Sequence, residues 1–175
     1  DGAITGSSTI NGVTIKADTT NFENSYLISQ NASTGTLSSA SANTGFGDSV
    51  FAALTSGTSN VAIGNAAMAG NTTGSLNTAV GNGAFDTNTT GASNVAIGDR
   101  ALTANTTADR NVAIGERAMT ANTTGATNTA VGAAALFSNT TASHNTAIGV
   151  SALQENTTGT EHVAVGSLAL DANTT

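Results

Sequence analysis

The sequence predicts an all-β protein, a parallel β-solenoid in which each turn of the chain, or coil, takes 17 residues. Three observations lead to this prediction. One phrase recurs from residue 43 to residue 175 at a constant spacing of 17 residues, without insertion or deletion. Each copy alternates short β-branched segments with turn-forming residues. Charged residues make up only 9% of the chain, whereas ordinary globular domains have roughly 25%.

Residues 1–42 precede the regular repeat and are interpreted as an irregular β leader that caps one end of the solenoid. Within residues 9–15, Asn11 and Gly12 separate two short β-branched segments, a pattern typical of a tight hairpin turn. Residues 25–29 are a further candidate strand, and a run rich in Ser, Thr, Gly and Ala over residues 31–42 leads into the repeat.

Residues 43–175 form eight copies of the repeat, of which the last is incomplete. The chain begins with Asp1 and stops three residues before the eighth copy is complete, so we expect a processed chain or a fragment of a longer one. The positions of each copy are numbered from 1 to 17, with position 1 at Asn43, Asn60, Asn77, Asn94, Asn111, Asn128, Asn145 and His162.

The residue types within a copy assign a structure to most positions. Positions 2 to 4 read Val or Thr, Ala, and Ile or Val in most copies, an alternation that predicts a short strand. Positions 8 to 10 predict a second extended segment around a Leu, Met or Phe at position 9. The Asn at position 12 is expected to begin the return turn, because Asn tolerates the left-handed backbone region. Position 5 is always Gly, where a corner with positive φ is least costly, and the predicted corner residues are Gly64, Gly81, Gly98, Gly115, Gly132, Gly149 and Gly166.

The period excludes two other repeat architectures. Seventeen residues are too few for a helical-hairpin repeat, and the copies lack the leucine spacing of a leucine-rich repeat. In a parallel solenoid, successive coils lie about 4.8 Å apart, and each position lies above its equivalent in the preceding coil. The amides at position 1 are therefore expected to form a ladder bonded from coil to coil, made of Asn60, Asn77, Asn94, Asn111, Asn128 and Asn145.

Strand alternation separates position 3 from positions 2 and 4. The Ala columns at positions 3 and 8, with the large residue at position 9, are expected to fill a thin interior. The column at position 4 is then left on an outer face and is too apolar to remain in water. Its natural partner is the same column of identical chains. The predicted subunit interface consists of Ile63, Val80, Ile97, Ile114, Val131, Ile148 and Val165.

The repeated phrase resembles the head repeats of trimeric autotransporter adhesins, and its 17-residue form with Asn-Thr-Thr is similar to repeats of bacteriophage tail fibres. The resemblance covers residues 43–175, and the leader around residues 9–15 is similar to segments that precede such repeats in fibre proteins. It implies a left-handed parallel β-roll, intertwined or packed as a homotrimer around an apolar axis. The chain departs from the adhesins in having no coiled-coil stalk, no anchor barrel and no 14-residue period.

The charge balance argues against two classes of partner. Four basic and eleven acidic residues give a net charge of -7, which disfavours binding to nucleic acid through its phosphates. The same sign disfavours anionic membrane surfaces. No apolar run approaches the roughly 20 residues that a transmembrane helix needs, so membrane insertion is not expected.

No catalytic constellation stands out, and no cofactor is expected. The chain has two histidines and no cysteine, so a nucleophile with its base has few candidates. His144 and Glu161 share position 17 in successive coils, and His162 is adjacent. These three side chains suggest a transition-metal site, but a surface ion pair is the preferred interpretation and no metal is assigned.

Two further patterns are explained without a site. Asp99 and Arg100 occupy the same positions as Glu116 and Arg117, so diagonal surface ion pairs between neighbouring coils are expected. The Asn-Thr-Thr triplets match the N-glycosylation pattern, but their recurrence at one turn favours turn chemistry.

These observations predict a structural and adhesive segment of a trimeric extracellular fibre and not an enzyme. The preferred function is a phage tail fibre involved in host attachment, at a virion or cell-surface location, with a host receptor or glycan as a further partner. The head of a bacterial trimeric surface adhesin is the alternative. An ice-binding β-solenoid is an alternative of another class, since regular Thr arrays on flat solenoids bind ice, although these Thr are adjacent in a turn.

Overall fold

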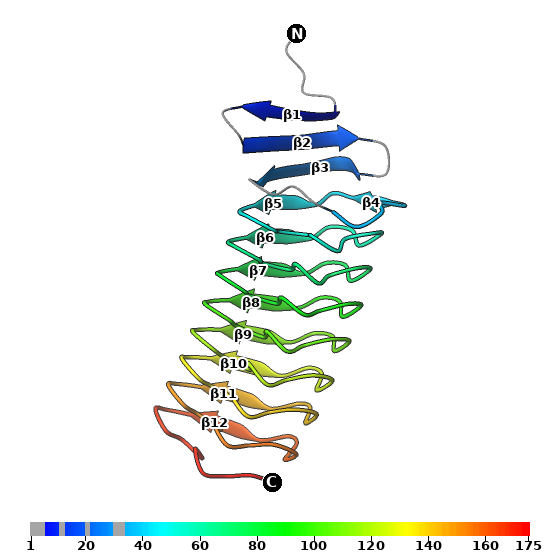
Figure 1. Cartoon of the computed structure of the whole chain (residues 1–175). Coiled ribbons are helices and arrows are strands. Elements are labelled where there is room, and N and C mark those ends of the chain that lie inside the picture. The colour runs from blue at the N-terminus through cyan, green and yellow to red at the C-terminus, as the bar shows by residue number, and fades with distance from the viewer. Residues whose placement is uncertain (1–5, 11–12, 20–21, 30–33) are drawn as a thin grey trace.

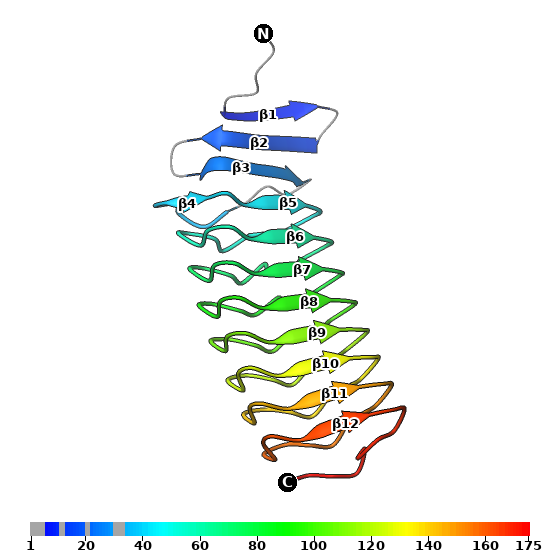
Figure 2. The same ribbon diagram turned by 180° about the vertical axis from the view of Figure 1, so that it is seen from behind.

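The computed structural model describes residues 6–10, 13–19, 22–29 and 34–175 (Figures 1 and 2). These residues form one 12-stranded sheet, which continues into a stack of 17-residue coils. The predicted fold class, an all-β parallel β-solenoid of about eight turns, is confirmed. No helix is assigned in the described residues, so none that could span a bilayer is found there.

Each coil contributes one strand of three residues, at repeat positions 2 to 4. Neighbouring strands pair in parallel with a constant offset of one repeat, so that Val95 lies beside Val112 and Ile97 beside Ile114. In chain order the strands are β5 (Thr44–Phe46), β6 (Val61–Ile63), β7 (Thr78–Val80), β8 (Val95–Ile97), β9 (Val112–Ile114), β10 (Thr129–Val131), β11 (Thr146–Ile148) and β12 (Val163–Val165).

The leader extends the same sheet as an antiparallel meander. β1 (Gly6–Ile10) pairs with β2 (Val13–Thr19), which pairs with β3 (Phe22–Ser29). The predicted turn residues Asn11 and Gly12 lie outside the described residues. β3 includes the strand expected over residues 25–29, and it pairs in parallel with both β5 and the short β4 (Ala40–Ser41).

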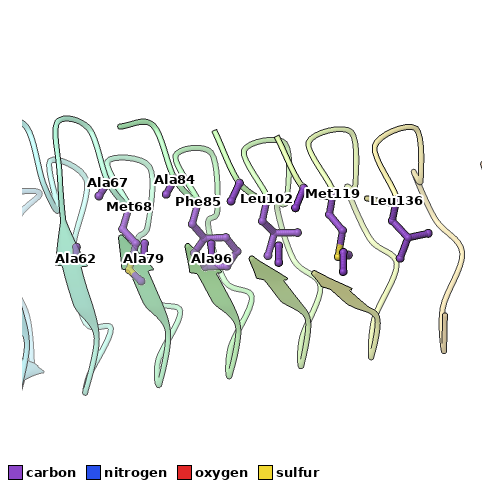
Figure 3. Packing of buried hydrophobic residues seen from close by; sticks show 14 of the residues in the cluster. Ala62, Ala67, Met68, Ala79, Ala84, Phe85, Ala96, Leu102, Met119 and Leu136 are labelled. Atoms are coloured by element: carbon purple, nitrogen blue, oxygen red, sulfur yellow. The ribbon is translucent and has the colours of Figure 1, made fainter. Parts of the chain in front are cut away.

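The interior is a thin layer between the strands and the return segment of each coil. Figure 3 shows the large side chains of position 9 in a row, pointing from the return segment toward the alanines of the strands. Burying one Leu, Met or Phe contributes about 1.5–3 kcal/mol per coil. Gly45 stands where the other coils have Ala, because a Cβ there would lie 2.8 Å from Leu27 and 3.1 Å from Phe51. The fully buried residues of position 9 are Phe51, Met68, Phe85, Leu102, Met119, Leu136 and Leu153.

The backbone turns at positions that carry ordinary side chains. Non-glycine residues with φ between 50° and 63° recur at positions 7, 9 and 17, as at Arg100, Leu102 and Arg110. The left-handed region costs about 1–2 kcal/mol for such residues. Each is held by a hydrogen bond to another coil: Arg100 and Arg110 donate to the preceding coil at 2.9 and 3.1 Å, and Leu102 donates to the following coil at 2.9 Å. The Asn at position 12 does not adopt positive φ; its side chain instead bonds to the backbone three residues later, as Asn105 does to the Ala108 carbonyl.

Position 5 requires Gly for two reasons. Its φ lies between 127° and 138°, a region that side chains rarely adopt. Its α-carbon also lies against the next coil, since a Cβ on Gly64 would lie 2.5 Å from the carbonyl oxygen of Gly81. Gly166 has a similar φ angle, but a Cβ added there would lie 3.9 Å from the Cβ of Ala169, which is ordinary contact.

Gly98→Ala should destabilise the chain more than Gly166→Ala does. A Cβ at Gly98 would overlap the carbonyl group of Gly115 and would also strain φ, for a cost on the order of 3–5 kcal/mol. Gly166→Ala carries only the φ strain of about 1–3 kcal/mol. Urea denaturation of the two variants measures the difference, and equal losses would show that close stacking at position 5 contributes nothing.

Candidate functional site

The strand column exposes an apolar face along the whole stack. We call the side chains at positions 2 and 4 of β5 to β12 the outer strand face. Position 3 points inward and is buried, so positions 2 and 4 point outward. Ile97 and Ile114, in the middle of the stack, are still 37% and 36% exposed, and Phe46 at its beginning is 58% exposed.

This face continues into the leader. Tyr26 pairs with Thr44 and therefore extends the column of position 2, and the residue is 63% exposed. Rows about 4.8 Å apart make one apolar strip instead of isolated residues. Contiguous apolar surface of this kind marks interaction sites on soluble proteins. The residues at position 4 are Phe46, Ile63, Val80, Ile97, Ile114, Val131, Ile148 and Val165.

Buried asparagine amides at position 1 hold the strands in register behind this face. The backbone N–H of Asn94 donates to Oδ1 of Asn77 at 2.9 Å, and Oδ1 of Asn94 accepts from the N–H of Asn111 at 2.9 Å. Nδ2 of Asn94 donates to the carbonyl of Ala108, at position 15 of the same coil, at 2.9 Å. Corresponding bonds occur at Asn60, Asn77, Asn111, Asn128 and Asn145.

A second amide ladder runs at position 12, where the sequence suggested only a turn. Nδ2 of Asn105 donates to Oδ1 of Asn88 at 3.0 Å and to the Ala108 carbonyl at 3.2 Å, and its Oδ1 accepts from Asn122 at 3.1 Å. Asn recurs at position 12 in every copy but the first, as it does at position 1 in every copy but the last, and this recurrence is the sequence signal for the ladder. The buried residues of this ladder are Asn71, Asn88, Asn105, Asn122, Asn139 and Asn156.

Burial of position 12 bears on the Asn-Thr-Thr triplets. The amide that would carry an N-linked glycan is fully buried and hydrogen-bonded in the stacked coils, as at Asn105. The folded stack therefore does not present the six buried Asn side chains for modification, whereas Asn173 of the last coil is only half-buried. The following Thr at position 13 also faces another coil, since Oγ1 of Thr72 donates to the carbonyl of Thr89 at 2.8 Å.

The ladders change at the two ends of the stack. Leu54 replaces Asn at position 12 of the first coil and is buried. His162 replaces Asn at position 1 of the last coil, with Nδ1 2.7 Å from the Thr160 carbonyl oxygen. Oδ1 of Asn156 is buried without a hydrogen-bond partner in the described part of the chain, because Asn173 donates to the Thr175 carbonyl at 2.9 Å.

The charged residues that flank the outer strand face are exposed. Oδ1 of Asp99 accepts a hydrogen bond from Nδ2 of Asn82 in the preceding coil at 3.0 Å. Within the described ranges, the diagonal ion pairs expected between Asp99 and Arg117 and between Glu116 and Arg100 are not formed. The two coils instead present separate carboxylate and guanidinium groups to solvent.

The histidine cluster does not form a metal site. His144 and Glu161 take left-handed φ angles of 63° and 62° at position 17, and both are exposed. The ring nitrogens of His162 lie within hydrogen-bond distance of the carbonyl groups of Thr160 in the seventh coil and Thr175 in the last coil. No group of three His, Cys, Asp or Glu side chains suited to a metal is present in the described ranges.

Two ionisable groups are perturbed by burial. Desolvation raises the pKa of the Asp86 carboxyl above its ordinary value, because the charged form loses solvation. Desolvation also lowers the pKa of Lys16, whose Nζ donates to Oγ1 of Thr34 at 3.0 Å. The two residues lie on different parts of the chain, Lys16 on β2 and Asp86 at position 10, so they do not form a site together.

No protein-family model, no curated protein and no solved structure matches this chain. The candidate functional surface is therefore chosen from the chain's own residues. The outer strand face is the largest exposed apolar feature that the described residues form, because it includes most of their exposed large hydrophobic side chains in one strip. Its chemistry suits contact with another apolar surface.

Asn105→Leu should destabilise the chain by about 2–5 kcal/mol. Leu fits the corresponding position of the first coil, but here it would remove two donated bonds and one accepted bond and leave buried groups of Asn88 and Asn122 less satisfied. Denaturant unfolding measures the loss. Thr107→Ala, on the exposed surface of the same coil, is the control and should change stability by less than about 0.5 kcal/mol; a similar small effect for Asn105→Leu would contradict the role of this ladder.

Asp86→Asn should raise the melting temperature at neutral pH but not at acidic pH. Because the folded-state pKa of Asp86 is raised, its contribution to stability is complete below the ordinary pKa of 3.8 and is lost as pH rises through the folded-state value. Asn stays neutral and avoids that loss. Thermal unfolding at about pH 3 and about pH 7 tests the sign, with exposed Glu161→Gln as control. A gain of equal size at both pH values would contradict the desolvation explanation.

Proposed function

We propose that this chain is a structural and adhesive segment of a trimeric extracellular fibre, most simply a bacteriophage tail fibre that takes part in host attachment. The observation that carries the proposal is the outer strand face, an apolar strip that runs along the whole coil stack. Three copies would pack their strips around a common axis, which removes the apolar side chains from water.

The stack suits a role as a stiff spacer. Backbone hydrogen bonds join neighbouring coils at positions around the whole coil, for example from Val95 to Asn111, from Leu102 to Ala118 and from Thr106 to Thr123 at 2.8–3.1 Å. Two amide ladders add side-chain bonds from the second coil to the seventh. A rod of eight coils is roughly 40 Å long, and each coil contacts only its neighbours, as in other solenoids.

The choice of a fibre segment over an enzyme follows from the residues at the exposed positions. Recognition of a receptor or glycan would fall to the variable positions between the strands and the position-12 ladder, such as Asp99, Arg100 and Ala104. A catalytic pair of acidic residues in a groove is not formed there. The resemblance of the repeat to tail-fibre and adhesin-head sequences supports an assembly of three copies. The head of a bacterial surface adhesin remains the alternative source of the segment.

Ice binding receives little support from the threonine columns. A flat ice-binding surface needs outward hydroxyl groups in more than one column. The position-13 hydroxyls, as at Thr89, donate to the next coil, at 3.0 Å for Thr89 to Thr106. Position 14, as at Thr90 and Thr107, is exposed from the second coil to the seventh, whereas position 13 is half-buried in most coils.

Ile97→Asp should abolish self-association. A carboxylate at the centre of the outer strand face would have to lose its solvation in the assembled fibre. Thr107→Asp, which adds the same charge to an exposed position of the same coil, is the matched control and should still assemble. Light scattering gives the mass in solution, and circular dichroism checks that both variants keep their strands. A stable monomer for the unmodified chain would contradict the proposal.

A further inference from the structure

The return segment of each coil offers a second surface, across the interior from the strands (Figure 3). We call the side chains at positions 10 and 11 of this segment the return flank. Backbone hydrogen bonds keep its rows in register: the N–H of Ala121 donates to the Phe137 carbonyl at 3.1 Å, and the N–H of Ser138 donates to the Gln154 carbonyl at 2.9 Å. Side chains of neighbouring coils on this flank therefore lie about 4.8 Å apart.

The return flank changes its chemistry after the fifth coil. In the fourth and fifth coils, positions 10 and 11 are Thr and Ala, and the Thr hydroxyl is used within the stack, since Oγ1 of Thr120 donates to the Arg117 carbonyl at 2.8 Å. The sixth coil instead carries Phe137 at position 10, and the seventh carries Gln154 and Glu155. An aromatic ring thus lies one coil away from two long polar side chains.

Packing of the interior does not account for the aromatic residue. Leu136, at position 9 of the same coil, already fills the interior and is fully buried. Phe137 is half-buried, but it is not one of the described side chains that pack against the core cluster. The equivalent position is Thr in the two preceding coils, so the fold does not require a ring there. Phe137 therefore presents apolar surface on the outside of the stack.

Polar groups suited to a ligand lie beside this ring. Oε1 of Glu155 accepts from Nε2 of Gln154 at 3.3 Å, and Oε2 accepts from Oγ of Ser138 at 3.4 Å. Both bonds are longer than the usual range and lie at the surface, so ligand hydroxyl groups can replace them. Each carboxylate oxygen has two lone pairs, and the Gln amide both donates and accepts. The cluster can therefore bond to neighbouring hydroxyl groups.

An apolar ring next to such groups matches the surface of a pyranose sugar. One face of a pyranose consists of C–H groups, and its rim carries hydroxyl groups that donate and accept. The C–H face would lie on Phe137, and the rim would reach Gln154 and Glu155 about 4.8 Å away, in the next coil. Glu155 and Asp171 make this end of the flank negative, and no coil has Lys or Arg at positions 10 or 11. The charge favours a neutral sugar over an acidic one.

We propose that Phe137, Ser138, Gln154 and Glu155 form a subsite for a neutral pyranose of a cell-surface glycan. The subsite rests on the proposed function, because it assigns a ligand class to the attachment role. Its residues all belong to one chain and lie across the interior from the outer strand face. Sugar binding at this subsite therefore does not require assembly of the copies.

Saturation-transfer NMR on the whole chain tests the subsite, with the methyl α-pyranosides of mannose, glucose and galactose as probes. At least one probe should bind, with a dissociation constant in the millimolar range that is usual for a small ligand on an open surface. N-acetylneuraminic acid is the acidic comparison and should bind more weakly. Absence of binding by all three neutral probes overturns the subsite, and tighter binding of the acidic sugar overturns its assignment to neutral sugars.

Three variants test the roles of the ring and the polar groups. Phe137→Thr introduces the residue of the two preceding coils, so the fold should be retained, and binding should weaken by about tenfold or more. Glu155→Ala should also weaken binding by about tenfold, because hydroxyl groups of the sugar lose their acceptor. Adding Thr103→Phe to Phe137→Thr supplies a ring beside Thr120 and Ala121 and should not restore binding. Circular dichroism checks that the variants keep their strands.

The outcomes separate the subsite from the proposed function. Unchanged binding by Phe137→Thr overturns the subsite, and restored binding in the variant that adds Thr103→Phe overturns the role of the polar groups. Light scattering on the same samples tests assembly. An oligomer that binds no probe overturns the subsite alone. A monomer whose probe binding depends on Phe137 overturns the trimeric fibre and leaves the subsite in place.

Discussion

From the second coil to the seventh, one carbonyl group at position 15 accepts hydrogen bonds from two buried asparagine amides and so closes and places the coil. In the fourth coil this group is the Ala108 carbonyl, bonded by Asn94 from the strand side and Asn105 from the return side. The same two side-chain amides donate to the Oδ1 atoms of their equivalents in the preceding coil, Asn77 and Asn88. Buried amides are costly unless they are satisfied, so any shift of register leaves polar groups without partners.

The unusual composition follows from this constraint. A coil of fixed perimeter with an interior one side chain thick needs small residues at positions 3 and 8 and one larger residue at position 9. Close contact between coils needs Gly at position 5, and hydrogen bonds replace the extensive apolar core of a compact domain. Charged residues are absent from the interior of the described coils, which explains their low share of 9%.

The period and the alternation within each strand were sufficient to predict the solenoid, because both are repeated in every copy. The inward Ala96 and the outward Ile97 follow from strand alternation alone. The left-handed turns at positions 7, 9 and 17 could not be predicted, since Arg, Leu and Met have no preference for that region and are held there by bonds between coils. The buried ladder role of Asn105 could not be predicted, because a recurring Asn is typical both of a turn and of a ladder of stacked amides. Only the packing of coils shows which of them applies.

Each coil contacts only the adjacent coils. The number of coils, and with it the length of the rod, can therefore change without altering the structure of the others. Removing 17 consecutive residues would bring equivalent positions together with the same amide, glycine and core neighbours, because the offset between coils is constant. The remaining coils would keep their surroundings. Duplication or deletion of one repeat in the gene therefore changes the length of the rod in whole steps of about 4.8 Å. The exposed positions of each coil can change separately.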